Sequence, residues 1–163
     1  MKYIPLTKGL MTCVDDSDYV TLSQYKWYVV GHPGKEYAAR CGRDSTGKQI
    51  HIRMHREILS APTNMEVDHI DGNRLNNCRS NLRLATRSQN GSNRTKSYPN
   101  ATSKYKGVTW HRRDQYWQAT IIHQNRHIHL GCFSSEKEAA VAYNTAAKKY
   151  HGNFAKLNNI TEE

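Results

Sequence analysis

The 163-residue sequence predicts an α+β protein in which several small antiparallel β-sheets are combined with a few helices. Three observations lead to this prediction. Residues 1–60 contain short segments rich in β-branched and aromatic residues, separated by turn residues. Residues 65–94 have the pattern of a strand, a polar loop, a second strand and a helix. Residues 103–158 contain three strand-like segments and then one helix, which predicts a three-stranded antiparallel sheet packed on one helix.

The composition is strongly basic, because 24 Lys and Arg against 14 Asp and Glu give a net charge of +10, with nine His besides. The excess is spread over both halves of the chain and does not form a basic tail. Such a surface suits a polyanion, so nucleic acid is the expected partner. Positive charge that serves only solubility is the alternative. Hydrophobic residues make up 37%, which favours small cores over one large core.

Membrane and secreted classes are not indicated. No apolar stretch approaches the roughly 18–20 residues of a membrane-spanning helix, and the N-terminal residues lack the apolar centre of a secretory signal. The cysteines are far apart and form no C-x-x-C pair, so neither a zinc ribbon nor a redox pair is indicated. Reduced thiols in a cytoplasm are expected. The four cysteines are Cys13, Cys41, Cys78 and Cys132.

The first 60 residues are expected to supply packing elements. Residues 37–40 and 49–52 are predicted to pair as strands across a turn at Asp44–Gly47. The acidic stretch Val14–Asp18 is interpreted as a turn or helix cap rather than an acid site. The residues expected to form an aromatic core are Leu22, Tyr25, Trp27, Tyr28 and Val29.

A short amphipathic helix is predicted at Met54–Leu59, where Pro62 ends it. Three basic side chains at its start, those of Arg53, His55 and Arg56, are possible phosphate contacts. A role in packing alone is an equally weighted alternative.

The stretch from residue 65 to 93 carries the residue types that phosphodiester hydrolysis requires. Asp68 offers a carboxylate and Asn90 an amide oxygen, which are ligands that a hard cation such as Mg²⁺ prefers. His69 has an ordinary pKa of about 6.5 and can accept a proton near neutrality. Because neighbouring strand residues point to opposite faces, Asp68 and His69 are expected at a strand end or bulge.

The remaining polar residues of this stretch are expected to form its scaffold. Ile70–Arg79 is a turn-rich loop, and Asn81 at its end is predicted to hydrogen-bond backbone groups and fix the loop's shape. Thr86 and Gln89 form a capping box that begins a helix, which places Asn90 in its first turns. The residues expected to form turns are Asn73, Asn76 and Asn77.

The motif D-H-x-D-G-N-x-x-N-N…S-N-L-R…T-x-x-x-N, which runs from Asp68 to Asn90, resembles the HNH endonuclease family in the variant with Asn at the last position. The likeness covers about residues 1–94, includes homing endonucleases of phages and mobile introns, and implies a ββα-metal fold at residues 65–94. It implies that His69 is the general base, that Asp68 and Asn90 bind the metal, and that Asn81 is the central asparagine of the active site. The zinc-bearing cysteine pairs of other members are absent, so one Mg²⁺ or Mn²⁺ and no structural Zn²⁺ is expected.

Residues 95–102 are polar and lack apolar periodicity, so a linker is predicted between two domains, residues 1–94 and 103–158. Strands are predicted at Tyr105–Trp110, Tyr116–Ile122 and Arg126–Phe133. In the second strand, Trp117, Ala119 and Ile121 lie opposite Tyr116, Gln118 and Thr120. In the third, Ile128, Leu130 and Cys132 are expected to lie opposite His127 and His129.

A helix with a face made mostly of alanine follows these strands, and it can therefore lie close to the sheet. Ser135 and Glu138 are predicted to form its capping box. Gly152 is placed where the C-terminal end of a helix favours glycine.

Residues 103–158 resemble an APETALA2/ethylene-response-factor DNA-binding domain, through the segments SKYKGV, WQA, HLGCF, EAAVAY and NFAKLN. Residues 159–163 are expected to be a tail. The resemblance implies a sheet that enters the major groove of DNA. Arg112 and Arg113 are expected at phosphates. The other expected DNA contacts are Lys106, Gly107, Thr109, Gln118, Thr120, His127 and His129.

Together these features predict a site-specific DNA endonuclease of the homing type that acts on double-stranded DNA as a monomer. The expected location is the cytoplasm of a bacterial or phage-infected host cell. Two alternatives remain: a sequence-specific DNA-binding regulator with an inactive nuclease fold, and a restriction or defence nuclease with the same chemistry. All site positions carry competent residue types, which argues against the regulator.

Overall fold

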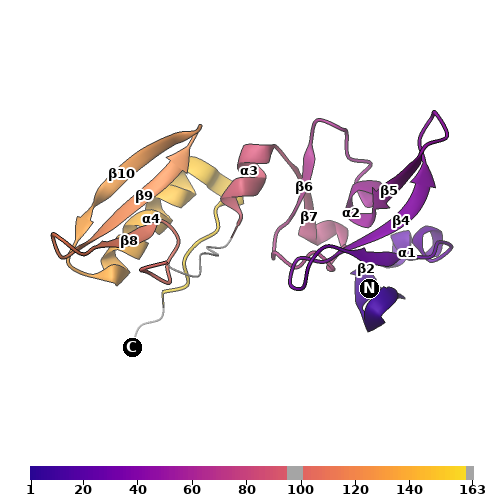
Figure 1. Cartoon of the computed structure of the whole chain (residues 1–163), viewed down its shortest axis with the longest axis horizontal. Helices are drawn as coiled ribbons and strands as arrows, with labels where there is room; N and C mark the ends of the chain where they lie inside the picture. The colour runs from indigo at the N-terminus through magenta and orange to yellow at the C-terminus, as the bar shows by residue number, and fades with distance from the viewer. Residues whose placement is uncertain (95–100, 161–163) are drawn as a thin grey trace. The chain divides into compact units, whose positions relative to one another are not determined.

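The computed structural model describes residues 1–94 and 101–160. The chain divides into two compact units, Met1–Asn90 and Gly91–Glu163. Most of the predicted linker, residues 95–100, and most of the predicted tail, residues 161–163, lie outside the described residues. Each unit is mixed α+β, in agreement with the predicted class (Figure 1).

Residues 1–94 form small antiparallel sheets, β1–β2, β3–β4–β5 and β6–β7, joined by short helices. The strands are β1 (Lys2–Pro5), β2 (Met11–Val14), β3 (Tyr28–Val30), β4 (Tyr37–Arg43), β5 (Gln49–Arg53), β6 (Glu66–His69) and β7 (Leu82–Ala85). The helices are α1 (Asp16–Leu22), α2 (Met54–Ile58) and α3 (Arg87–Ser92), with 3₁₀ turns η1 (Thr7–Gly9) and η2 (Arg79–Asn81). The predicted hairpin of residues 37–52 and the short helix after it are therefore confirmed.

The core of this unit lies between the sheets and α2. Trp27 is 2% exposed, and its indole Nε1 donates to the carbonyl of Leu22 at 2.7 Å. Met54 at the start of α2 is fully buried in the same cluster. Tyr25, predicted to join this core, is instead on the surface, where the Arg40 guanidinium lies 4.1 Å from its ring centroid.

The loop between β6 and η2 is fixed to β2, which is distant in sequence. Cys13 N donates to the carbonyl of Leu75 at 3.0 Å, and Asn77 N donates to the carbonyl of Cys13 at 2.9 Å. The helix start predicted in Val14–Asp18 is confirmed, with Asp15 at the N-cap position of α1, although its side chain makes no capping hydrogen bond. Asp15 also accepts from the backbone N of Arg79 at 2.7 Å. The N-terminal segment therefore supports the loop that carries the asparagines.

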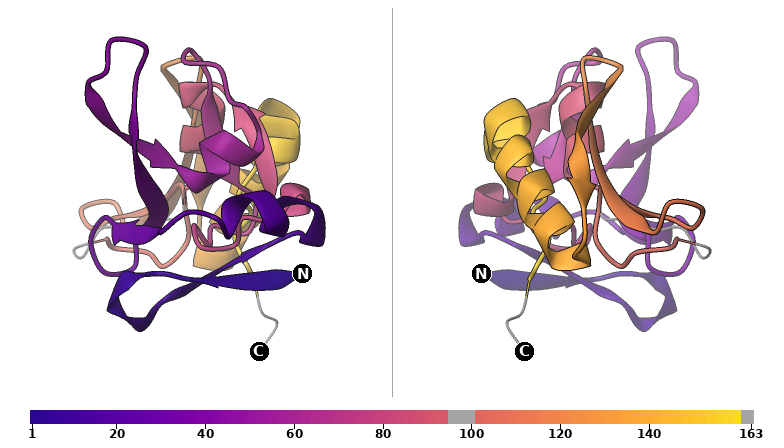
Figure 2. Two further views of the ribbon diagram at one scale, coloured as in Figure 1. Left: turned by 90° about the vertical axis from the view of Figure 1, so that its right-hand side faces the viewer. Right: turned by 90° about the vertical axis from the view of Figure 1, so that its left-hand side faces the viewer.

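Residues 101–160 form one antiparallel sheet, in the order β10–β9–β8, and one long helix that packs along one face of it (Figure 2). The elements are β8 (Val108–His111), β9 (Tyr116–His123), β10 (Arg126–Phe133), α4 (Glu136–His151) and the 3₁₀ turn η3 (Gly152–Phe154). The alanine face of α4 is buried against Val108, Ala119 and Ile121 of the sheet, as its composition predicted.

Three predictions for this region are corrected. The first strand begins at Val108 and not at Tyr105, which is buried just before it. A β-bulge between His129 and Gly131 inverts the alternation, so Cys132 pairs with Gln118 on the exposed face. Ser135 caps α4 by accepting from Lys137 N at 3.2 Å, whereas the Glu138 carboxylate accepts from the Ser134 hydroxyl at 3.5 Å. The reciprocal capping box is therefore not formed as predicted.

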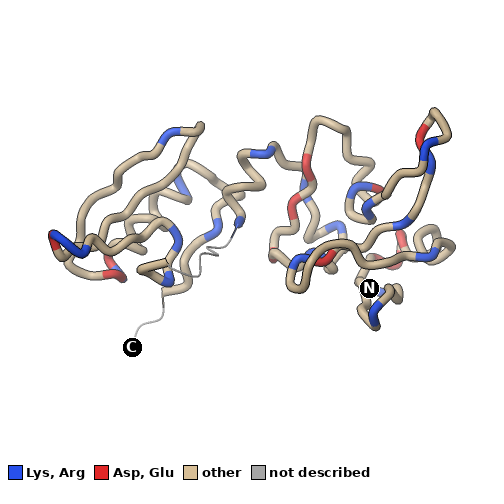
Figure 3. Tube along the Cα trace, viewed as in Figure 1, with Lys and Arg blue, Asp and Glu red and all other residues tan. Residues whose placement is uncertain are grey.

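Basic side chains are distributed along both units, as expected from the sequence (Figure 3). Within the part of the chain that the structure describes, no helix has the length and apolar character needed to cross a membrane.

Candidate active site

Strands β6 and β7 and helix α3 place the predicted site residues. The strands pair with Asp68 opposite Arg83 and His69 opposite Leu82. The predicted capping box at the start of α3 is confirmed: Thr86 N donates to Gln89 Oε1 at 2.8 Å, and Gln89 N donates to Thr86 Oγ1 at 3.3 Å. This strand–loop–strand–helix order is the arrangement predicted for residues 65–94.

Asp68 is almost fully buried, with 4% of its surface exposed, and is held by an arginine. Arg83 donates to Oδ2 of Asp68 from Nε at 2.8 Å and from Nη2 at 2.6 Å. A carboxylate buried without a partner would be strongly destabilising, and this two-point ion pair neutralises it. The pair therefore keeps a charged oxygen ligand inside the fold.

Asn90 lies in the first turns of α3, as predicted, and its amide is directed back to β6. It donates from Nδ2 to the carboxylate of Glu66, which is two residues before Asp68. Because strand residues two apart share a face, Glu66 and Asp68 lie on the same side of β6. The helix thus brings Asn90 to the face of the strand that carries two carboxylates.

His69 is the last residue of β6, at the strand end predicted for it, and is 5% exposed. Its Nε2 lies 3.2 Å from Oδ1 of Asn77. The Thr12 hydroxyl donates to the carbonyl of Leu75 at 2.8 Å, so it accepts from the Asn77 amide at 2.7 Å. Asn77 therefore presents its oxygen to His69. This arrangement favours the tautomer of neutral His69 in which Nε2 donates to Asn77.

Two aromatic rings lie beside His69. The centroid of His55 is 5.2 Å away in an edge-on arrangement, and that of Tyr37 is 6.2 Å away. Burial lowers the pKa of His69, and this effect outweighs the Asn77 bond and the nearby carboxylates, which raise it. Burial, together with His69, lowers the pKa of His55 to about 3. Both imidazoles are therefore neutral at pH 7, and His69 can accept a proton.

Asn81 closes the loop between the two strands. Its Oδ1 accepts from Asp71 N at 3.0 Å, and its Nδ2 donates to the carbonyl of Asn76 at 2.8 Å and to Asp71 Oδ1 at 2.9 Å. The predicted bonds from Asn81 to backbone groups are therefore present, and Asn81 acts on the loop that supports His69.

The predicted phosphate contacts before β6 are partly wrong. His55 is 4% exposed, so it is a packing residue. The Arg56 guanidinium donates to three backbone carbonyls, those of Ala61, Pro62 and Met65, and fixes the turn between α2 and β6. Arg53 alone is exposed. A buried ring and a guanidinium occupied by carbonyls cannot meet a phosphate in this conformation.

The exposed face of the β8–β9–β10 sheet carries most of the predicted DNA contacts. Thr109 pairs with Gln118, and Thr120 pairs with His129, so these four side chains share one face, with His127 beside them. Gln118 Nε2 and His129 Nδ1 lie 3.1 Å apart. Arg112 and Arg113 are exposed in the turn between β8 and β9.

Lys106 and Gly107 were predicted to contact DNA, and the structure gives them internal roles. Lys106 Nζ donates to the carbonyls of Ser92 and Arg94, at 2.5 and 2.7 Å, near the end of α3. Burial and the nearby Lys156 lower the pKa of Lys106 to about 8. A side chain on Gly107 would lie 2.0 Å from the Tyr143 ring, so this glycine is required for packing.

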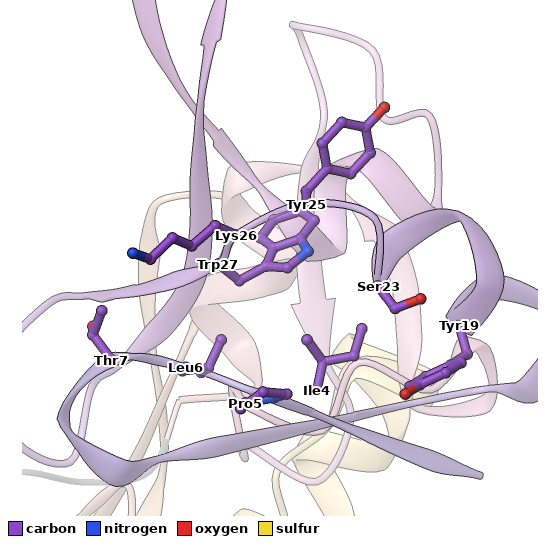
Figure 4. Close-up of a pocket in the computed structure, with 9 residues that line it drawn as sticks. All are labelled: Ile4, Pro5, Leu6, Thr7, Tyr19, Ser23, Tyr25, Lys26 and Trp27. Atoms are coloured by element: carbon purple, nitrogen blue, oxygen red, sulfur yellow. The ribbon is translucent and has the colours of Figure 1, made fainter.

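A separate hollow of about 490 Å³ lies beside β1 and α1 (Figure 4). None of the predicted site residues lines it. Its lining residues are Ile4, Pro5, Leu6, Thr7, Tyr19, Ser23, Tyr25, Lys26 and Trp27.

Comparison with known proteins identifies the family. A family model described as HNH endonuclease matches residues 60–92. The chain is 34% identical over 155 residues to the uncharacterized HNH endonuclease L560 of Acanthamoeba polyphaga mimivirus, covering 94% of this chain and 77% of that protein. The chain belongs to the HNH endonuclease family. The HNH segment includes β6, β7 and α3, the elements that place Asp68, His69 and Asn90.

Two further relatives match shorter parts of this HNH protein. It is 33% identical over 110 residues to Protein 3.8 of Escherichia phage T7, covering 64% of this chain and 89% of that protein. It is also 39% identical over 75 residues to the AP2-like ethylene-responsive transcription factor At1g16060 of Arabidopsis thaliana. That match covers 44% of this chain and 21% of the plant protein.

The face of β6 in the HNH unit carries the donor types that a hard divalent cation prefers. Asp68 and Glu66 offer carboxylates and Asn90 an amide, and such ligands together with several waters suit this class of ion. Among the described residues, no group of three or more His, Cys, Asp or Glu side chains is placed to hold a metal ion. Water would therefore complete the coordination of a cation bound here.

Three residues of the HNH site were not predicted from the sequence: Glu66, Arg83 and Asn77. Period-2 alternation in β6 could have identified Glu66, which shares a face with Asp68. Arg83 could be identified only once the register between β6 and β7 was known. Asn77 was predicted to form a turn, and this is wrong, because it is fully buried and contacts His69.

Proposed function

We propose that this HNH protein is a metal-dependent, site-specific DNA endonuclease of the homing type, with His69 as the general base. The observation that carries the proposal is the environment of His69: a neutral, buried imidazole oriented by Asn77, in the strand that also bears Asp68. A general base must be neutral before it takes a proton, and burial lowers the pKa of His69 and so favours its neutral form.

In the proposed reaction, His69 takes a proton from a water molecule through Nδ1. The resulting hydroxide attacks the phosphorus atom in line with the bond to the 3′ oxygen, and that bond breaks. The products are a 5′ phosphate and a 3′ hydroxyl, whose proton comes from solvent. The imidazolium of His69 returns its proton to water. Asn77 holds the ring in one orientation throughout, which reduces the entropic part of the barrier.

Asp68 and Asn90 are the proposed ligands of Mg²⁺ or Mn²⁺, and Glu66 is added to them because it contacts Asn90 on the same strand face. When bound, the cation supplies positive charge to the phosphate and to the leaving oxygen. Asn81 has a structural role, which is to hold the loop.

The second unit is the proposed DNA-reading part, of the APETALA2 type. The support is a polar sheet face that bears Thr109, Gln118, Thr120 and two histidines, together with the partial likeness to a plant transcription factor. A two-stranded or larger β-surface can enter the major groove and read base edges there. One His69 site in each chain makes nicking by a monomer the expected elementary reaction.

A plasmid-nicking assay tests this function. His69→Ala is expected to lower the rate of nicking in Mg²⁺ or Mn²⁺ by about 10²–10⁴-fold, the usual contribution of a general base. Binding to DNA should change less than about twofold, because His69 is buried. His32→Ala, a change of an exposed histidine in the same unit, is the matched control and should cut normally. Near wild-type nicking by His69→Ala would show that the base is assigned wrongly.

A further inference from the structure

The ring of Tyr37, at the start of β4, connects the surroundings of His69 with two arginines. Its centroid is 5.2 Å from that of His55, which in turn lies 5.2 Å from His69. The guanidinium carbon of Arg53 is 5.0 Å from the Tyr37 centroid, and that of Arg74 is 4.7 Å from it. Two cations therefore share one aromatic ring at the edge of the candidate active site.

Neither cation is neutralised within the fold. Among the described residues, Arg53 and Arg74 form no ion pair. Besides its contact with the Tyr37 ring, Arg74 donates from Nη1 to the carbonyl of Lys35 at 3.2 Å. Three other arginines in this unit are paired with carboxylates: Arg40 with Glu57, Arg79 with Asp18 and Arg83 with Asp68. Arg53 and Arg74 thus place two guanidinium groups without a carboxylate partner around the Tyr37 ring, whose centroid is 6.2 Å from that of His69.

We propose that Arg53 and Arg74, held over Tyr37, form a two-guanidinium clamp for a phosphate group of the DNA strand that His69 cuts. The assignment rests on the proposed nuclease function and adds two residues to it, Arg74 and Tyr37. A guanidinium that stacks on an aromatic face keeps its N–H groups at the ring's rim, where they can donate to phosphate oxygens. The stacking also orders both side chains before DNA binds, which lowers the entropic cost of the contact.

A phosphodiester group suits the clamp. Its two non-bridging oxygens can each accept from one guanidinium, and the two guanidinium carbons lie 5.0 and 4.7 Å from the same ring centroid. Arg53 is exposed and Arg74 half-buried, so a ligand can reach them from solvent. A DNA strand supplies phosphates on both sides of the bond that is cut. Inorganic phosphate has the same oxygens and is the other possible source.

Binding to a random-sequence duplex in the catalytically disabled His69→Ala protein tests the clamp. Arg53→Gln and Arg74→Gln are each expected to weaken binding about tenfold at low salt. Each should also reduce the slope of log affinity against log salt by about one, because each loses one phosphate contact. Lys8→Gln, which removes an exposed charge from the same unit, is the matched control and should leave the slope unchanged. Circular dichroism melting confirms that each variant is folded.

Substitutions of Tyr37 separate the ring from the charges. Tyr37→Phe keeps the stacking surface and should bind DNA like the His69→Ala parent. Tyr37→Leu keeps both arginines but removes the ring, so binding should weaken while the salt slope stays within about half a unit. Equal binding by Tyr37→Leu and Tyr37→Phe would overturn the role of the ring.

The outcomes distinguish the clamp from the nuclease function. If the wild-type protein cuts DNA but Arg53→Gln and Arg74→Gln leave the salt slope unchanged, the clamp is wrong and the function stands. If no divalent metal supports cutting but the slopes fall as expected, the clamp stands and the function fails. Binding of millimolar inorganic phosphate that is lost in the Arg74→Gln protein, but with which DNA does not compete in the wild type, would assign the site to free phosphate and overturn the DNA clamp.

Discussion

At the scale of single residues, the ion pair between Asp68 and Arg83 combines stability with ligand binding. The Asp68 side chain is 5% exposed and that of Arg83 is 18% exposed, so water screens their attraction weakly. The same carboxylate is proposed to bind the metal. Arg83 and a bound cation would therefore compete for the Asp68 carboxylate. Without metal, the stability of the folded protein depends on Arg83.

Arg83→Leu is expected to destabilise the nuclease unit by about 3 kcal/mol, because it leaves a buried carboxylate without a partner. Millimolar Mg²⁺ or Mn²⁺ should restore part of the loss, since a ligand that binds only the folded state stabilises it. Thermal melting with metal and with chelator measures both effects. Arg79→Leu, which breaks an exposed pair, is the control. If no divalent cation reduces the loss of stability in Arg83→Leu, Asp68 is not a metal ligand.

The buried His55 predicts a loss of stability in acid. Its pKa is lowered to about 3, whereas the unfolded chain takes up this proton at about 6.5. The contribution is fully present above pH 6.5 and is lost as the pH falls toward 3, because only the unfolded chain binds the proton there. Between pH 6.5 and 5 the loss is about 2 kcal/mol.

Urea unfolding of the wild type and of His55→Phe at both pH values measures this effect. The phenyl ring keeps the contact with Tyr37 and cannot be protonated, so the variant should lose about 2 kcal/mol less on acidification. His32→Phe, at an exposed position, should lose as much stability on acidification as the wild type. Identical pH dependence of the His55→Phe and wild-type proteins would show that His55 is not the group responsible.

At the scale of elements, close packing of α4 on its sheet depends on the alanine face and on Gly107. The alanines were evident in the sequence, whereas the reason for the glycine was not. Gly107 has a φ of +74°, and a Cβ there would lie 2.0 Å from Cδ2 of Tyr143 and 2.5 Å from the carbonyl oxygen of Thr120. This position is conformationally and sterically restricted to glycine.

Gly107→Ala is therefore expected to destabilise the second unit by about 3 kcal/mol or more, through backbone strain and overpacking. Gly91→Ala is the control, because its Cβ would meet no atom within 4 Å and its backbone φ is not positive. It should be neutral or slightly stabilising. Denaturant unfolding followed by Trp fluorescence compares them. Equal free energies of unfolding for the two variants would contradict the packing role of Gly107.

At the scale of the whole molecule, the net charge of +10 supplies general attraction to DNA, and the sheet face supplies the proposed reading surface. These contributions can be separated by placing equal changes of charge at different sites. His127 and His129 lie on the sheet face, whereas Lys148 and Lys149 are exposed on α4.

The double variant His127→Glu, His129→Glu is expected to bind DNA about tenfold or more weakly, because it introduces carboxylates at the reading face. The rate of nicking at saturating DNA should be unchanged. Lys148→Gln, Lys149→Gln lowers the net charge by the same amount and should have a smaller effect. Gel-shift titration gives the affinities. Equal losses in both double variants would mean that net charge alone governs binding.

Local patterns in the sequence were sufficient for the elements whose signals are short-range. The hairpin across Asp44–Gly47, the helix start at Asp15 and the box formed by Thr86 and Gln89 depend on neighbours within a few residues, and the structure confirms them. The motif from Asp68 to Asn90 also sufficed to indicate the HNH family. These features depend on backbone hydrogen bonds and side-chain spacing between residues that are close together in the sequence.

Contacts between distant segments could not be obtained in this way. The bond that the Asn77 amide donates to Thr12 turns the Asn77 oxygen toward His69, and the register of β6 on β7 pairs Asp68 with Arg83. The bulge after His129 moves Cys132 to the exposed face, and folding turns Lys106 inward. Each outcome depends on which distant segments pack against each other. Burial and pairing between residues far apart in the sequence leave no pattern in the residues around either one. Residue types therefore identified the chemistry available, whereas three-dimensional packing selected the partners that tune it.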